Sequence, residues 1–276
     1  MGFGVMSMSL LLAIGVAPAV ASATVHIAKI GTAVISGAAH WRFGNVDGRA
    51  VLLLGVPGAV GAYLGATLLS SLSLNAAKPY VSVILLTLGA VIVARFIHRR
   101  RTANQTPEDA AERPVRPRWL LAPLGLIGGF VDASGGGGWG PVTTTTLVAS
   151  RQLSTRTTIG TVNAAELLVA IAASVGFLQH LGSAGVRWDI TAAILLGGLL
   201  AAIPAAWLVR HVDDRVLGMG VGVLIVVLSI DSFLTLLAVP EALLWVVRVV
   251  GLTLTFGLIA DALWRARSKA VTEPVD

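Results

Sequence analysis

The chain has 276 residues, of which 12% are charged and 55% are hydrophobic, and its mean hydropathy is +0.84. A charged fraction about half that of soluble domains argues against a soluble enzyme and a disordered chain, and indicates a polytopic membrane protein. The absence of cysteine excludes a disulfide framework, a zinc–thiolate site and a cysteine nucleophile. The net charge of +6 does not indicate nucleic-acid binding, because seven of the 17 arginines lie in one connector, 95–118, between apolar segments.

Apolar runs divide the chain into predicted membrane helices. In chain order they cover residues 3–16, 19–39, 50–71, 79–97, 119–133, 138–149, 157–181, 188–209, 216–239 and 242–264. The longer runs can each span ~30 Å of hydrocarbon at 1.5 Å per residue. Six of the seven tryptophans fall near predicted span ends, where the headgroup level favours them, and Trp139 is the exception. We expect an all-α membrane fold with about eight transmembrane helices.

Three short matches in the same order indicate an internal duplication. Residues 4–11 and 140–147 share a glycine, two hydroxyl residues and a leucine, and residues 23–29 parallel 160–166. The third match is an aspartate eight residues before a glycine in both halves. Residues 119–134 have no counterpart in the first half, so we expect that half to lack its first helix. Chance similarity between helices rich in small residues is the alternative.

Positive charge predicts the orientation and the division into domains. We expect the Arg-rich linker 99–118 to be cytoplasmic. If residues 119–149 enter and return as a broken hairpin, most of the remaining basic groups, including those at the C-terminal end, lie on the same side; a single crossing is the alternative. The predicted organisation is a first transmembrane repeat over 1–98, the linker, a second and inverted repeat plus a final helix over 119–266, and a polar tail over 267–276.

The strongest local feature runs from Asp132 to Pro141 and contains four consecutive glycines. Glycines in an apolar context interrupt a helix, and irregular backbone at membrane depth persists only where protein or a water-filled cavity satisfies it. A helix that begins near Gly138 would direct N–H donors and its positive dipole end at an anion. In the alternative interpretation the glycines allow close helix packing and the threonines bond to their own helix. With their first-half counterparts, the substrate-binding candidates in this feature are Gly4, Ser7, Ser9, Gly136, Gly137, Gly138, Thr143, Thr144 and Thr145.

Ionisable residues inside predicted helices form a second group of candidates. His26 and Lys29 are three residues apart on one helix face, and Asn163 and Glu166 occupy the equivalent positions of the second half. A charge near the membrane centre costs roughly 2.5–3.5 kcal/mol, so it faces a partner or a cavity. We expect Lys29 to meet Glu166 or Asp132 across the repeat interface. A structural ion pair and a hydrogen-bonded core histidine are the alternatives.

Roles follow from the chemistry of these groups. Lys29 and Asn163 are candidates for binding substrate, and His26, Asp132 and Glu166 are candidates for proton coupling or an ion pair. The sequence contains no P-loop, no Gly-x-Ser-x-Gly elbow and no His/Asp/Glu cluster with metal-ligand spacing. We therefore expect no enzyme activity, no metal and no cofactor.

Several of these segments together resemble the sulfite exporter TauE/SafE family of membrane permeases. The resemblance rests on the glycine-rich openings of both halves, on the small-residue stretch at 17–24, on the loop from His40 to Asp47, and on the glycine-rich helix from Gly55 to Gly65. It covers the chain to about residue 240. Lys29 stands where similar sequences carry an acidic residue.

The resemblance implies a multi-pass transporter of the inner membrane that moves sulfite, an organosulfonate or a related small anion. We expect an exporter, coupled to protons, with the lipid bilayer and the anion as its partners and a cytoplasmic C-terminus. A homo-oligomer is left open. The alternatives are a non-transporting subunit of a larger membrane complex and an anion channel.

Overall fold

The computed structural model describes residues 3–102, 117–150, 153–211 and parts of 222–257, and these residues form helices and no strands. Four helical segments are long and apolar enough to cross a membrane, namely Pro18–Arg42, Gly48–Ser71, Leu74–Ala94 and Arg156–Leu181. Shorter apolar helices cover Phe3–Ala13, Trp188–Ala201 and Ala242–Gly251. The predicted all-α, polytopic fold is confirmed. The last two predicted spans, most of the linker and the tail lie largely or wholly outside the described residues.

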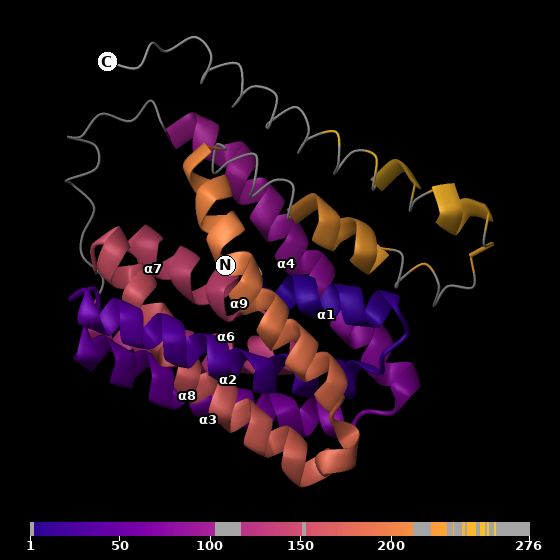
Figure 1. Ribbon diagram of the computed structural model, residues 1–276, viewed down its shortest axis with the longest axis horizontal. Coiled ribbons are helices and arrows are strands. Elements are labelled where there is room, and N and C mark those ends of the chain that lie inside the picture. Colours follow the sequence, from indigo (N-terminus) through magenta and orange to yellow (C-terminus); the bar gives the residue numbers. More distant parts are fainter. Residues whose placement is uncertain are drawn as a thin grey trace.

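Figure 1 shows the helices in their chain order. They are α1 (Phe3–Ala13), α2 (Pro18–Arg42), α3 (Gly48–Ser71), α4 (Leu74–Thr102), the 3₁₀ turn η1 (Arg118–Leu120), α6 (Leu121–Gly135), the π-helical turn η2 (Gly140–Thr144), α7 (Thr145–Ser150), α8 (Thr155–Leu181), the 3₁₀ turn η3 (Ser183–Gly185) and α9 (Trp188–His211). Local chemistry sets several of these starts. Pro18 opens α2 because its fixed φ suits the first helical position. Asp47 caps α3 by accepting a 3.0 Å hydrogen bond from the amide of Ala50.

The chain turns back within the membrane region after α6. Gly136 ends α6 in the left-handed conformation, with φ of 74°. The chain then returns alongside α6, since a Cβ on Gly128 would lie 2.7 Å from the side chain of Thr143. At the start of α8, Gly160 lies against the carbonyl of Asn45, in the loop between α2 and α3. Residues 119–149 therefore form a broken hairpin whose two ends lie on the side of the 43–47 loop.

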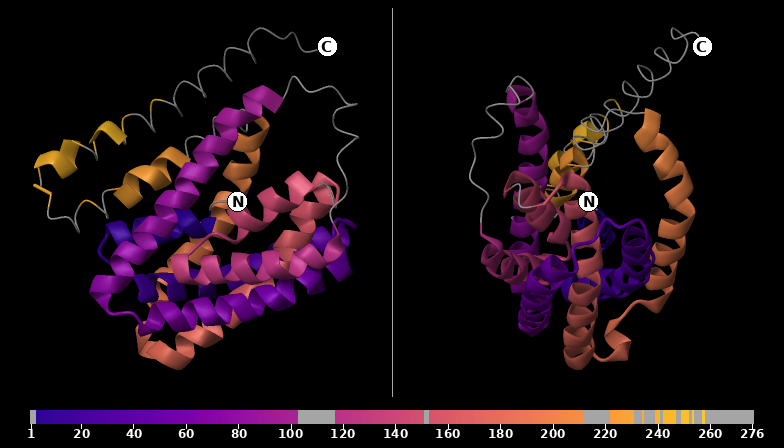
Figure 2. Two further views of the ribbon diagram at one scale, coloured as in Figure 1. Left: turned by 180° about the vertical axis from the view of Figure 1, so that it is seen from behind. Right: turned by 90° about the vertical axis from the view of Figure 1, so that its left-hand side faces the viewer.

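The remaining helices have directions that their contacts define. The ring of His26 lies 6.0 Å from that of Phe177, whereas Gly37 lies against Ala164, so α2 and α8 run antiparallel. α3 runs in the same direction as α8, and the first part of α9 passes α2 in the direction of α2, from Thr24 toward Thr32. Figures 1 and 2 show α2, α3, α6 and α8 packed together, with α4 and α9 crossing them steeply. Two inverted halves would have these helix directions, and the inverted repeat stays a prediction.

Glycines bring α3 and α6 into direct backbone contact. A Cβ on Gly129 would lie 2.0 Å from the carbonyl oxygen of Gly58, and one on Gly61 would lie 2.0 Å from that of Leu126. Helices in lipid associate through such close approach, because lipid tails are as apolar as the side chains themselves. Trp139 is fully buried beside this interface, and its indole Nε1 donates to the carbonyl of Val162 at 3.0 Å.

The tryptophans whose side chains the structure describes divide as the sequence predicts, and Trp207 and Trp264 lie outside that set. Trp41, Trp119, Trp188 and Trp245 are each more than half exposed, and they lie at or near helix ends. Exposed indoles at these positions suit the headgroup level of a bilayer. Trp139, the predicted exception, is the largest side chain among the fully buried residues.

Candidate functional site

The glycine-rich openings of the two halves meet beside Lys29. A Cβ on Gly4 would lie 3.3 Å from the Cα of Gly137 and 3.6 Å from the ammonium nitrogen of Lys29. A Cβ on Gly137 would lie 2.4 Å from the amide nitrogen of Val5. Position 137 therefore has no room for a side chain, and the crossing brings α1 and the tip of the hairpin against the middle of α2.

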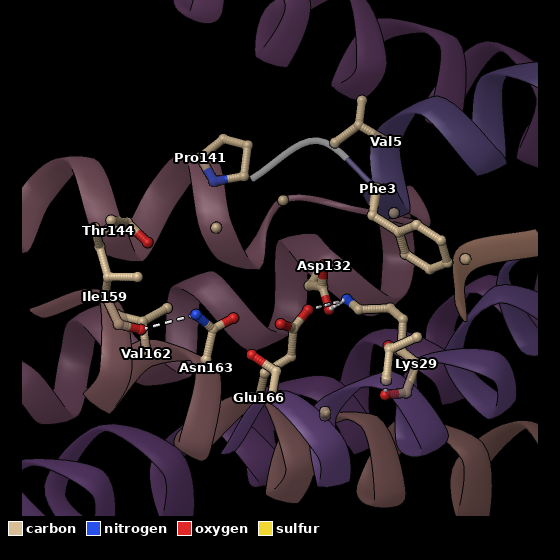
Figure 3. A pocket seen from close by; sticks show the side chains of 17 residues that line it. Phe3, Val5, Lys29, Asp132, Pro141, Thr144, Ile159, Val162, Asn163 and Glu166 are labelled. Atoms are coloured by element: carbon tan, nitrogen blue, oxygen red, sulfur yellow. Dashed lines mark hydrogen bonds and ion pairs between the residues drawn. The ribbon is translucent and has the colours of Figure 1, made fainter. Parts of the chain in front are cut away.

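Lys29 pairs with both of the carboxylates that the sequence offers as its partners. Its Nζ lies 2.7 Å from Asp132 Oδ2 and 2.9 Å from Glu166 Oε1 (Figure 3). The lysine is 3% exposed and lies near the middle of α2. Because a buried charge in a membrane protein requires a partner or a cavity, this contact links α2, α6 and α8 at one point.

Asp132 is held by three donors. Its Oδ2 accepts from Lys29 and lies 3.1 Å from His26 Nε2, and its Oδ1 accepts from the amide of Trp139 at 2.9 Å. The residue is fully buried. An ionised carboxylate is an acceptor only, so this set of donors matches the ionised form and fixes its position.

His26 joins the cluster through both ring nitrogens. Nδ1 lies 2.8 Å from the carbonyl oxygen of Ser22 and 3.3 Å from its hydroxyl, which donates to the carbonyl of Ala133. Nε2 lies 3.1 Å from Asp132 Oδ2. Which nitrogen donates depends on the tautomer, and in either case the ring links α2 to α6 beside Lys29.

A cavity of about 350 Å³ lies against this cluster. Its lining consists of Phe3, Gly4, Val5, Lys29, Thr32, Ala33, Ser36, Asp132, Gly138, Gly140, Pro141, Thr144, Ile159, Val162, Asn163, Glu166 and Gly198. Along α2 the lining extends from Lys29 to Ser36, and along α8 from Glu166 back to Ile159. Both directions lead toward the end of the bundle that carries the 43–47 loop, where Arg42, Arg49 and Arg118 also lie.

The structure brings half of the predicted site residues to this cavity. Those that line it are Gly4, Lys29, Asp132, Gly138, Thr144, Asn163 and Glu166. Those outside the lining are Ser7, Ser9, His26, Gly136, Gly137, Thr143 and Thr145. Of the second set, only His26 is tied directly to the charge cluster.

Three of the predicted residues outside the lining have other contacts. The hydroxyls of Thr143 and Thr145 donate to the carbonyls of Trp139 and Pro141 in their own helical turn. Gly136 lies under the Met8 side chain, where a Cβ would be 2.3 Å from Met8 Cγ. These contacts are the helix back-bonding and close packing that the sequence offers as the alternative interpretation.

Sequence reasoning missed the polar side of α2. Thr32 and Ser36 line the cavity three and seven residues after Lys29, which is the spacing of one helix face. That periodicity could have identified them. Gly198 on α9 also lines the cavity, and no local signal distinguishes it from the neighbouring Gly197. Among the described residues, no group of three or more His, Cys, Asp or Glu side chains could hold a metal ion.

Membrane-spanning helices, a helix broken at its glycines and buried charges facing a cavity together define a membrane transporter. Comparison with known proteins agrees with this class. The family model described as "Sulfite exporter TauE/SafE" matches residues 1–232. The "Probable membrane transporter protein YtnM" of Bacillus subtilis (strain 168) is 44% identical over 229 residues, which are 83% of this chain and 75% of that protein. The chain belongs to the sulfite exporter TauE/SafE family. No solved structure matches it.

Proposed function

We propose that this transporter is a secondary carrier that exports a small anion, such as sulfite or an organosulfonate, across the inner membrane in coupling with protons. The observation that carries the proposal is the buried ammonium of Lys29, which faces a 350 Å³ cavity where two glycine-rich segments cross. A fixed cation in a low-dielectric surrounding attracts a small anion far more strongly than it would in water.

The cavity supplies further groups for an oxyanion. Figure 3 shows the Thr144 hydroxyl and the Asn163 amide on the side of the cavity away from Lys29, and the Asn163 nitrogen donates to the Ile159 carbonyl at 3.0 Å. The volume lies at the lower end of the range of about 300–1,000 Å³ for small-molecule sites, which favours an anion of few heavy atoms. Lys29 would bind the negative charge of the anion, and the polar side chains would orient its oxygens. Glu166, Asp132 and His26 would take up and release the coupled protons.

The basic end of the bundle is proposed to face the cytoplasm, with the C-terminus on that side. The cavity would then face the cytoplasm in this conformation, as loading for export requires. The chain has no cysteine, so single substitutions report accessibility directly. In intact cells, a membrane-impermeant maleimide should label Ser183→Cys, beyond α8, but not Phe43→Cys at the opposite end. Labelling of Phe43→Cys alone would reverse the orientation.

The test of the carrier itself is flux of radiolabelled sulfite and methanesulfonate into proteoliposomes. Wild-type protein should transport, and Lys29→Met should lose transport. The double variant Lys29→Met/Glu166→Gln removes a cation and a carboxylate together, so it should fold while also failing to transport. Transport by Lys29→Met at the wild-type rate would remove Lys29 from the site. A voltage-dependent current far above carrier rates would indicate an anion channel instead.

A further inference from the structure

We infer that Glu166 is an exchangeable counter-anion: its carboxylate occupies the Lys29 contact that the substrate needs, and it leaves that contact by taking up a proton. One proton then moves with each monovalent anion in the same direction. This inference rests on the proposed anion carrier and specifies how that carrier is coupled.

The two carboxylates around Lys29 differ in how firmly they are held. Asp132 has donors on both oxygens, from Lys29, His26 and the Trp139 amide, and its side chain is 1% exposed. Among the described residues, Lys29 is the one that links Glu166 to the cluster, and the Glu166 side chain is 24% exposed and lines the cavity. A carboxylate with three donors is costly to displace, whereas one with a single donor and access to a water-sized cavity can rotate away. Glu166 is therefore the exchangeable partner.

The position of Glu166 makes it a competitor of the anion. In the view of Figure 3 its carboxylate lies between the Lys29 ammonium and the side chains of Asn163 and Thr144. An oxyanion that reached Lys29 from the cavity would have to occupy this position. Asp132 and Glu166 already share this ammonium, so a third anion at the same distance would be repelled by both carboxylates, and Glu166 must lose its charge when the substrate binds.

The exchange leaves the charge of the cluster unchanged. A proton on Glu166 raises the charge by one unit, and a bound monovalent anion lowers it by one unit. The empty and the loaded sites therefore carry the same charge, so substrate binding adds no uncompensated charge to the buried cluster.

No other titratable group in the described residues competes for this role. Around Glu166, α2 presents Lys29 and His26, and α6 presents Asp132. His40 of α2 lies beside Asn163, one turn from Glu166 and toward the end of the bundle. Residues 140–150 contain no titratable side chain. The titratable groups of α3 and its cap are Arg49 at its first turn, Asp47, which pairs with Arg118, and Tyr63, which bonds to Gln179.

The sign of the coupling follows. Protonation of Glu166 accompanies anion binding, so acidification on the cavity side strengthens binding. Protons and anions move together, as in a symporter, so each exported anion carries one proton out and the outward anion gradient drives export against an inward proton gradient. An antiporter would require the proton to leave when the anion binds, which is the opposite of the competition at Lys29.

The experiment uses the full chain in proteoliposomes and radiolabelled methanesulfonate, whose single charge does not change with pH. A pH-sensitive dye inside the vesicles reports protons. For wild type we expect a methanesulfonate gradient to acidify the lumen with one proton per anion, at a rate that an imposed membrane potential does not alter. For Glu166→Gln, which mimics the protonated form, we expect anion exchange to continue, with proton movement abolished and binding independent of pH.

Asp189→Asn is the matched control, because it makes the same change of carboxylate to amide at an exposed position at the start of α9. It should keep wild-type proton coupling. Proton movement retained in Glu166→Gln, or a folded Glu166→Gln that binds no anion at any pH, would overturn the inference. Wild-type anion flux without proton movement would contradict the coupling but not the proposed anion carrier. Absence of any wild-type flux or binding, with both sulfite and methanesulfonate, would remove the proposed function and this inference with it.

Discussion

The α3–α6 interface and the α2–α8 contact use small residues in opposite ways. Between α3 and α6, glycines spaced four apart, such as Gly125 and Gly129, place one backbone directly on the other. Between α2 and α8, long charged side chains meet at the edge of a cavity, and the consecutive glycines nearby interrupt a helix. Periodic glycines therefore mark packing and consecutive glycines mark a break, although both raise the glycine content equally.

The largest effect is expected where the packing interface is broken. In Gly129→Leu, the new Cβ would lie 2.0 Å from the Gly58 carbonyl oxygen, and no rotamer can relieve a clash with backbone. We expect a loss of more than about 3 kcal/mol and very little monodisperse protein in detergent, measured by size-exclusion chromatography. Gly197→Leu is the control, because a Cβ there would meet nothing within 4 Å. Equal yields from the two variants would contradict the packing role of Gly129.

The next largest effect concerns the charge cluster. Lys29→Met leaves Asp132 and Glu166 without their shared cation, and removal of one partner of a buried ion pair costs about 3–5 kcal/mol. The double variant Lys29→Met/Glu166→Gln should recover part of this loss, because one unpaired carboxylate is gone. Resistance to unfolding in mixed micelles would measure both. A double variant that is no more stable than Lys29→Met would show that the Glu166 carboxylate costs no stability when Lys29 is absent.

A smaller effect is expected at the buried tryptophan that joins the two regions. Trp139→Phe loses the 3.0 Å hydrogen bond from the indole to the Val162 carbonyl, which is worth about 1 kcal/mol, and leaves a small void. Trp119→Phe changes an indole that is 66% exposed and should leave stability in detergent unchanged. The difference between the thermal midpoints of the two variants measures the contribution of burial to stability. A midpoint for Trp119→Phe below that of Trp139→Phe would contradict this expectation.

The smallest effect is expected at the loop end of α3. Arg118→Ala removes an ion pair to Asp47 at 3.1 Å, and the arginine side chain is 51% exposed, so the loss should be below about 1 kcal/mol and should vanish in high salt. Asp47→Ala also removes the cap of α3 and should cost about 1 kcal/mol more, independent of salt. Identical salt dependence in the two variants would argue against the cap.

Much of the fold could be predicted from the sequence because its signals are local. Apolar runs and arginine placement predicted the all-helical, multi-pass fold, and the hairpin agrees with the charge count. The helix that contains Pro79 begins earlier than expected, at Leu74, because a proline near the start of a helix breaks few hydrogen bonds. Lys29 could be matched with Asp132 and Glu166 because a buried charge has few acceptable partners.

The division of the glycines and threonines could not be predicted. Whether Gly137 lines a cavity or packs on Val5 depends on the distance between two segments that are far apart in the sequence. Whether Thr143 or Thr144 faces the cavity depends on the π-helical turn at Gly140–Thr144, which shifts the register of the side chains by one residue. Neither has a sequence signal that hydropathy or residue spacing can detect.

The separation of the ion-pair partners along the chain has a consequence for biosynthesis. Lys29 precedes Asp132 by 103 residues, which takes on the order of 5–20 s at roughly 5–20 residues per second. During that interval α2 has left the ribosome with a lysine and a histidine that lack their acidic partners. At roughly 2.5–3.5 kcal/mol for the charged lysine, the apolar residues of α2 must favour insertion strongly enough to offset the cost until the second half arrives. We therefore expect the insertion machinery to retain α2 longest in nascent chains that stop before Asp132.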